Sequence, residues 1–120
     1  MILVDTSVWI DHVRAGDSRL SALLAERRVL GHPLVVEELA CGHLPNRGEF
    51  LGFLKAMTFA PVATHFETLS FIEQAGLHGV GLGAADVHLL ASARLAGARV
   101  LTRDKALAKA ARRLGMLADG

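Results

Sequence analysis

Cysteine is nearly absent from this chain: Cys41 is the only one among 120 residues. A single cysteine excludes an internal disulfide framework and a thiolate metal site, because each needs at least two thiols. A reducing cytoplasm is therefore the expected compartment.

The chain also lacks an excess of charge of either sign. Charged residues make up 21% of it and the formal net charge is +1, which excludes a polybasic nucleic-acid coat and an acidic disordered tail. A near-neutral total does not exclude RNA as a partner, because the local distribution of charge decides that question. Apolar residues make up 52% of the chain, enough for the core of one domain over residues 1–120.

Long hydrophobic runs are missing as well. No basic segment followed by a long apolar stretch opens the chain, so no signal peptide is expected. Charged residues and histidines interrupt the apolar stretches well short of the roughly 20 residues that span a bilayer. The sequence predicts a soluble protein with no membrane part.

Short apolar runs alternate with helical patterns along the whole chain. Strands are expected at residues 2–4, 28–31 and 99–102, with two briefer ones at 59–62 and 116–118. Helices are expected at about 6–13, from 18, at 33–41, around 50–54, and at 65–74, 84–95 and 105–114. Thr6 or Ser7 is expected to cap the first helix, Ser18 to open the second, and Pro33 to begin the third. This alternation predicts an α/β domain with a mainly parallel sheet.

Acidic residues stand at positions where such a sheet binds ligands. Asp5 and Asp104 directly follow or lie just past apolar strands, and ligands of open α/β sheets lie beyond the carboxyl ends of the strands. Asp86 lies near the start of a helix after a glycine-rich loop, and Glu38 lies within the 33–41 helix. Four converging carboxylates would repel one another, and a hard divalent cation relieves that repulsion. Mg²⁺ and Mn²⁺ prefer oxygen ligands, and such sites activate water against phosphodiesters.

Four motifs in order make the chain resemble the PIN-domain ribonucleases, and among them the VapC-type toxins of type II (VapBC) toxin–antitoxin systems. Residues 2–9, Ile-Leu-Val-Asp-Thr-Ser-Val-Trp, look like the opening strand and Asp-Thr/Ser-Ser of that family. Residues 38–42, Glu-Leu-Ala-Cys-Gly, are similar to its Glu-Leu-x-x-Gly helix. Residues 83–93 resemble its Asp-bearing helix, and residues 101–104, Leu-Thr-Arg-Asp, its Thr-x-Asp. The match covers nearly the whole chain.

The resemblance implies a PIN-like three-layer α/β/α fold and a metal-dependent endoribonuclease. It assigns Mg²⁺ (or Mn²⁺) binding and catalysis to four carboxylates: Asp5, Glu38, Asp86 and Asp104. Thr6 and Thr102 would support this site. Two departures stand out: Ala106 occupies the place of a possible fifth acid, and Glu37 precedes Glu38, so only the following Leu-x-x-Gly favours Glu38. Water attacking the RNA phosphodiester in line would leave a 5′-phosphate and a 3′-hydroxyl.

The resemblance also implies partners. A VapC-like toxin is neutralised by a VapB-type antitoxin whose C-terminal segment occupies the cleft. Family members commonly form homodimers, and heterotetramers or larger assemblies with the antitoxin. The apolar side chains of the 18–24 and 50–54 helices are the expected dimer surface.

Basic residues near the acids offer contacts to RNA phosphates. The candidates are Arg14, Arg47, Arg103 and Lys105. A solvated surface role is about as good an interpretation for any one of them. The basic residues of the 105–114 helix are expected to form an exposed face.

Other interpretations stay open. Asp5 and Asp104 would also serve as helix caps, Asp86 would favourably occupy a first helical turn, and Glu38 would be an ordinary solvated residue. A receiver-type signalling domain has a similar length, but Lys55 lies where its phospho-acceptor Asp belongs. Within the PIN fold, the alternatives are a housekeeping RNA-processing nuclease and a binding module without catalysis.

Overall fold

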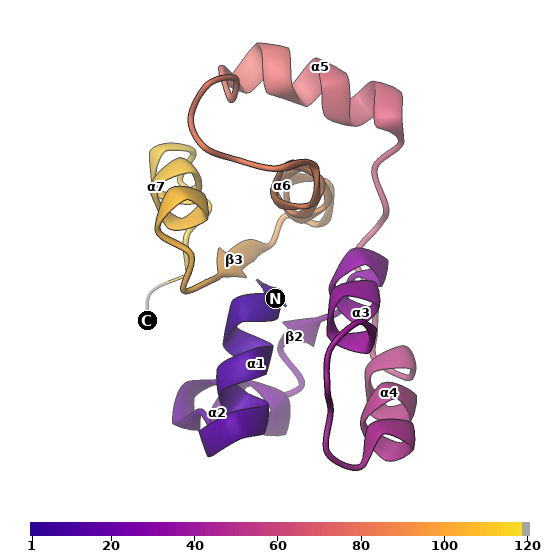
Figure 1. Cartoon of the computed structure of the whole chain (residues 1–120). Helices are drawn as coiled ribbons and strands as arrows, with labels where there is room; N and C mark the ends of the chain where they lie inside the picture. The colour runs from indigo at the N-terminus through magenta and orange to yellow at the C-terminus, as the bar shows by residue number, and fades with distance from the viewer. Residues whose placement is uncertain (119–120) are drawn as a thin grey trace.

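A short parallel sheet forms the centre of the computed structural model, which describes residues 1–118. Its strands are β1 (Ile2–Val4), β2 (Val29–Leu30) and β3 (Arg99–Leu101), in the order β2-β1-β3 (Figure 1). Leu3 pairs with Leu30 on one side and with Val100 on the other, and both pairings are parallel. All three of these side chains are buried, as expected for parallel strands covered on both faces.

The two briefer predicted strands form single bridges instead of strands. Phe59 bridges Gly31 in parallel, and Leu117 bridges Val100 in parallel. Two backbone hydrogen bonds support each bridge, such as Ala60 N–H to the Gly31 carbonyl at 3.0 Å. The bridges extend the parallel sheet beyond β2 at one edge and beyond β3 at the other.

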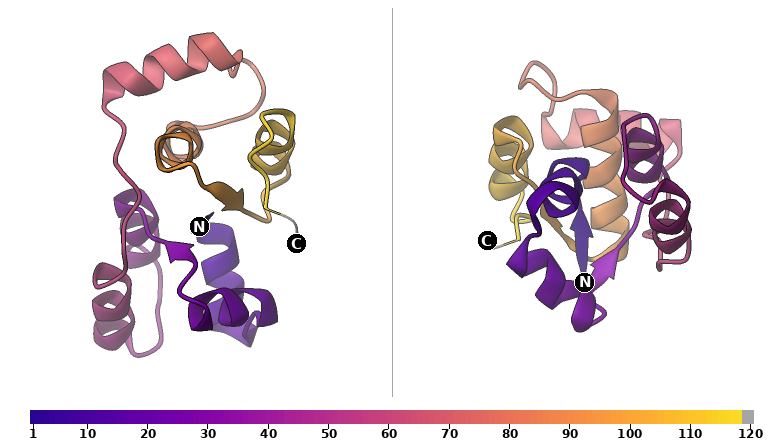
Figure 2. Two further views of the ribbon diagram at one scale, coloured as in Figure 1. Left: turned by 180° about the vertical axis from the view of Figure 1, so that it is seen from behind. Right: turned by 60° about the horizontal axis from the view of Figure 1, so that its bottom comes forward.

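Seven helices surround this sheet within residues 1–118: α1 (Thr6–Ala15), α2 (Ser18–Ala25), α3 (Pro33–Ala40), α4 (Arg47–Lys55), α5 (His65–Ala75), α6 (Ala84–Ala96) and α7 (Lys105–Arg113). Figures 1 and 2 show α1 to α4 on one side of the sheet and α5 to α7 on the other. The predicted three-layer α/β/α fold is confirmed. No helix in this part of the chain is long and apolar enough to cross a membrane. Residues 119 and 120 of the predicted single domain lie outside the described range.

The cap of the first helix differs from the prediction. Asp5 occupies the N-cap position of α1 without a cap hydrogen bond from its side chain, so neither Thr6 nor Ser7 is the cap. The Thr6 hydroxyl donates to Glu38 and the Ser7 hydroxyl donates to Asp5. Ser18 is the first residue of α2 as predicted, and Asp17 caps this helix by accepting from the Leu20 N–H at 2.8 Å. Pro33 begins α3 as predicted.

The predicted dimer surface stays a prediction, and three of its apolar side chains are not available for it. Leu20 and Leu23 of α2 and Leu54 of α4 are buried in the core of the chain itself, because they face the sheet layer that each helix covers. Phe53 is 47% exposed. The two large apolar side chains with the highest exposed fractions lie on α5, where Phe66 is 83% and Leu69 60% exposed.

Candidate active site

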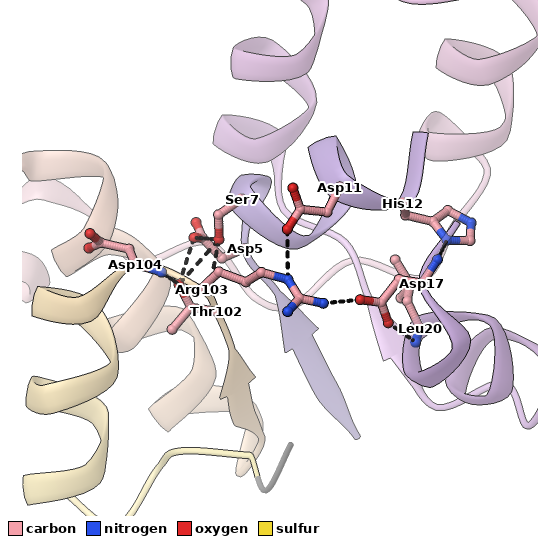
Figure 3. Close-up of polar contacts among 9 residues, drawn as sticks. All are labelled: Asp5, Ser7, Asp11, His12, Asp17, Leu20, Thr102, Arg103 and Asp104. Atoms are coloured by element: carbon pink, nitrogen blue, oxygen red, sulfur yellow. Dashed lines mark hydrogen bonds and ion pairs between the residues drawn. The ribbon is translucent and has the colours of Figure 1, made fainter. Parts of the chain in front are cut away.

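Asp5 lies where the two central strands end together. Its backbone N–H donates to the Leu101 carbonyl at 2.9 Å, which ties the end of β1 to the end of β3. The side chain is buried, and its Oδ2 accepts from the Ser7 hydroxyl at 2.7 Å and the Thr102 hydroxyl at 2.8 Å (Figure 3). Two hydroxyl donors therefore hold this carboxylate in one orientation and stabilise its charge.

Asp104 reaches the same edge from the turn after β3. Its backbone N–H donates to Thr102 Oγ1 at 3.0 Å, so Thr102 links the two aspartates. Its own Oδ2 accepts from the Leu107 N–H at 3.0 Å and caps α7. The helix-cap interpretation of Asp104 is confirmed, and the cap uses one carboxylate oxygen only.

Asp86 stands in the first turn of α6 on the same edge. Its Oδ2 accepts from the Gly83 N–H at 3.0 Å. Burial raises the pKa of Asp86 above its ordinary value, and the negative charges of Asp5 and Asp104 raise it further, against the lowering effect of the Gly83 hydrogen bond. Asp5 and Asp104 are thus each close enough to Asp86 for their negative charges to act on it.

Glu38 enters from α3 on the other side of the sheet edge. Its Oε1 accepts from the Thr6 hydroxyl at 2.8 Å, which connects the exposed Glu38 to the first residue of α1. Thr6 and Thr102, the two predicted supporting residues, therefore each bond one of the four acids. This bond also places Glu38, rather than Glu37, toward the N-terminus of α1.

The four acids share one feature: each uses a single oxygen for protein hydrogen bonds. Within residues 1–118, the second oxygen of each has no protein partner, and none of the four pairs with Lys, Arg or His. No three His, Cys, Asp or Glu side chains of the described chain come close enough to hold a metal ion by themselves. The donors fit a hard cation in their chemistry, since Mg²⁺ typically binds one or two carboxylates and keeps several waters.

Ser7 was expected only as a possible helix cap, and it is a residue of the site. Its hydroxyl donates to Asp5 Oδ2 at 2.7 Å and accepts from the backbone N–H of Arg103 at 3.0 Å. It also lies 3.4 Å from Thr102 Oγ1. The signal was present in the Asp-Thr-Ser motif, because residues two apart at a helix start bring a hydroxyl back to the carboxylate.

Two of the four candidate RNA contacts are engaged in the protein itself. Arg103 forms ion pairs with Asp11 (Nε to Oδ2, 2.8 Å) and with Asp17 (Figure 3). Arg47 donates to the carbonyls at the end of α3, with 2.6 Å to Ala40. Arg14 and Lys105 are exposed. RNA contact by all four stays a prediction.

The protein is thus a parallel α/β domain with acidic residues at the carboxyl ends of its strands. The family model of the PIN domain matches residues 2–113, and the chain belongs to the PIN domain family. Membership in this family excludes the receiver-type alternative.

Known proteins resemble the chain over nearly its whole length. It is 49% identical over 117 residues to Ribonuclease VapC32 of Mycobacterium tuberculosis strain CDC 1551, covering 97% of this chain and 94% of that protein. The same values hold for Ribonuclease VapC32 of strain H37Rv. The solved structure of FitAcB from Neisseria gonorrhoeae matches with a TM-score of 0.66 at 23% identity, covering 93% of this chain and 94% of that chain. This last likeness shows the fold.

Proposed function

We propose that this protein is a metal-dependent endoribonuclease that acts as the toxin of a toxin–antitoxin pair. One observation of the site carries the nuclease assignment: three aspartates at one sheet edge, and Glu38 bonded to Thr6 next to Asp5, each have an unbonded oxygen and no cationic partner among residues 1–118. The 49% identity to proteins named Ribonuclease VapC32 supports RNA as the substrate.

Mg²⁺, with Mn²⁺ as the alternative, is the cofactor that suits these donors. Asp5, Glu38, Asp86 and Asp104 would hold it together with water. When bound, the cation would stabilise the charge that develops on the phosphodiester and lower the pKa of a water molecule.

The protein groups around Asp5 would fix the geometry of this chemistry. Ser7 and Thr102 bond the same oxygen of Asp5, so its other oxygen faces the site with a fixed direction. Thr6 holds Glu38 in the same way. Such outer hydrogen bonds orient ligating carboxylates, and their loss typically costs 10- to 100-fold in metal affinity or activity.

A VapB-type antitoxin is the partner that the toxin role requires, in a heterotetramer or a larger assembly. A housekeeping RNA-processing nuclease is the second candidate function, because the same four acids would serve it. An antitoxin reading frame next to the gene, and growth arrest that its co-expression relieves, would support the toxin. Expression without any effect on growth would favour the housekeeping enzyme. The cytoplasm is the compartment that we propose, since Cys41 alone forms no internal disulfide.

A homodimer is part of this proposal, and besides the predicted helices α5 offers an apolar surface for it. Phe66 and Leu69 are exposed there, beside a hollow of about 370 Å³ that Phe66, Phe71 and Leu95 help to line. A protruding phenylalanine next to a hollow suits a two-fold contact, in which each copy offers both parts. Light scattering after size exclusion should give a dimer for the wild type and a monomer for Phe66→Ser. A wild-type monomer at micromolar concentration would contradict the dimer.

The nuclease is tested by incubating wild type and Asp5→Asn with total cellular RNA in Mg²⁺, Mn²⁺ or excess EDTA. Asn nearly preserves the shape of Asp5 while removing its charge, and matched circular dichroism spectra would exclude unfolding. Cleavage by the wild type alone, abolished by EDTA, is the expected result. Equal cleavage by Asp5→Asn, or none by the wild type in either metal, would refute the catalytic assignment.

A further inference from the structure

A pocket of about 410 Å³ opens between the first turns of α3, α5 and α6. Pro33 and Leu34 of α3, His65 of α5, and Ala85 and His88 of α6 form much of its lining. The remaining wall comes from residues 62–64, from Ala84 and from buried His32. No Lys, Arg, Asp or Glu lines it.

The pocket borders the acidic site on two helices. Leu34 and Glu38 are four residues apart on α3, so they lie on the same face of that helix, one turn from each other. Ala85 in the wall immediately precedes Asp86 on α6. The pocket and the acidic site thus share the helices α3 and α6.

Imidazole rings supply the polar edges of this otherwise apolar pocket. His65 and His88 meet edge to face, with 5.4 Å between ring centroids and 85° between ring planes. His88 Nδ1 lies 3.3 Å from the Thr68 hydroxyl, which leaves its Nε2 without a protein hydrogen bond within residues 1–118. The structure therefore offers two imidazole rings at the pocket, and the Nε2 of His88 has no hydrogen-bond partner within residues 1–118.

His32 fixes the floor of the pocket. Its Nδ1 accepts from the Leu34 N–H at 3.1 Å, so its Nε2 carries the hydrogen and donates to the Ser92 hydroxyl at 3.0 Å. Both ring nitrogens are bonded in this way and the side chain is 1% exposed. His32 thus links the start of α3 to Ser92 of α6. It offers no free polar atom to the pocket.

We propose that this pocket binds one base of the RNA next to the phosphodiester that is cleaved. The inference rests on the proposed nuclease function. Proteins recognise single-stranded RNA by splaying out bases, stacking them on aromatic side chains including His, and bonding their edges. The volume falls within the range of small-molecule sites. The absence of Lys and Arg from the lining disfavours a phosphate as the occupant and favours an uncharged, flat group.

The probes for the test are the four nucleoside 5′-monophosphates, with ribose 5-phosphate as the probe that lacks a base. Binding is followed through the ¹H and ¹⁵N resonances of the imidazole rings in the full-length protein, in EDTA, where neither metal nor cleavage contributes. The variants are His65→Ala and, as the matched control, His43→Ala, whose exposed side chain lies outside the pocket.

At least one nucleotide should shift the resonances of His65 and His88, while ribose 5-phosphate should not. His65→Ala should weaken that binding about fivefold or more, the factor expected from losing a stacked base, and His43→Ala should bind like the wild type. Equal shifts by ribose 5-phosphate, no shift by any nucleotide, or equal affinity of both variants would overturn the proposal. The absence of any nucleotide effect would point to an apolar segment of a protein partner as the occupant.

The test separates this inference from the nuclease itself. RNA cleavage without base-dependent shifts would overturn the base pocket and leave the nuclease intact. Base-dependent shifts without any cleavage would overturn the nuclease instead.

Discussion

The residues that follow β3 lie between two groups of aspartates, which differ in their partners. Asp17 uses both carboxylate oxygens: Oδ1 accepts from the Leu20 N–H, and Oδ2 pairs with Arg103. Asp5 and Asp86 each bond through Oδ2 alone and have no cationic partner in the described chain. Figure 3 shows Arg103 directed toward Asp11 and Asp17, away from Asp104.

The difference separates structural acids from acids that are available for chemistry. The hydrogen bond from Leu20, followed by the charge of Arg103, holds the pKa of Asp17 below its ordinary value against the opposing effect of burial. Burial and like charges do the opposite to Asp86. Asp17 thus has a cationic partner in the protein, and Asp86 has none within residues 1–118. A carboxylate without such a partner is available to bind an external cation.

The largest expected effect is that of Asp86→Asn, compared with Asp17→Asn. The first should lower RNA cleavage by about 100-fold or more, because it removes a charge that nothing else in the site replaces. In EDTA, the same variant should melt no lower than the wild type, since a desolvated and repelled charge is gone. Asp17→Asn should show the reverse pattern, with a lower melting temperature and cleavage per folded molecule near that of the wild type. An Asp86→Asn protein that unfolds readily would make Asp86 a structural acid.

Removal of the Ser7 hydroxyl tests the support of Asp5. Ser7→Ala should reduce cleavage about 10-fold, the lower end of the effect typical for groups that orient metal ligands. Ser21→Ala, at an exposed position of α2, is the matched control and should behave as the wild type. Initial rates on one RNA substrate at saturating Mg²⁺ measure both. Equal rates for Ser7→Ala and wild type would exclude a positioning role for Ser7.

The paired group is tested through stability. Asp17→Ala should lower the free energy of unfolding by about 1–2 kcal/mol, through the lost cap of α2 and the lost pair with Arg103, in which the Asp17 side chain is buried. Asp11→Ala removes only an exposed ion pair and should cost less than about 1 kcal/mol. Urea denaturation of both variants measures the difference. A larger loss for Asp11→Ala would show that Arg103, rather than the cap, dominates this region.

The smallest effects concern pH, and they have opposite signs in the two groups. Asp17 has a lowered pKa, so its stabilisation is present above about pH 3.8 and disappears as the pH falls through its folded pKa below that value. Asp86 has a raised pKa, so the unfolded chain releases that proton first and stability falls as the pH rises above 3.8. The urea midpoint is measured in EDTA across this pH range. The midpoint of Asp17→Asn should approach that of the wild type at low pH. The midpoint of Asp86→Asn should rise relative to that of the wild type as the pH rises. Parallel curves for both variants would contradict this assignment.

Much of the fold follows from patterns in the sequence. The run Ile2-Leu3-Val4 is apolar on both faces and becomes the central strand β1, and Pro33 begins α3 as its missing N–H predicts. The edge pairings of Phe59 and Leu117 were predicted as strands and are single bridges. Local sequence indicates an extended segment, but the number of bridges depends on how far the neighbouring strand continues.

The candidate site was predictable in its acids and less so in its partners. Motif order picked out Asp5 and Asp104, and the structure brings them together through Thr102. The role of Arg103 was not predictable, because its partners Asp11 and Asp17 approach it only after α1 and α2 pack. The core placement of part of the expected dimer surface was not predictable for a related reason: helical periodicity shows that α2 has an apolar face, and only the packed chain shows that Leu20 and Leu23 on it lie in the core.

The central claim, that the unpaired acids bind a cation, is tested most directly by titrating Mn²⁺ into the metal-free protein by calorimetry. Wild type and Asp17→Asn should bind Mn²⁺ with similar affinity, and Asp86→Asn should bind it at least about 10-fold more weakly. Equal affinity of all three proteins, or no heat of binding in the wild type, would contradict the claim.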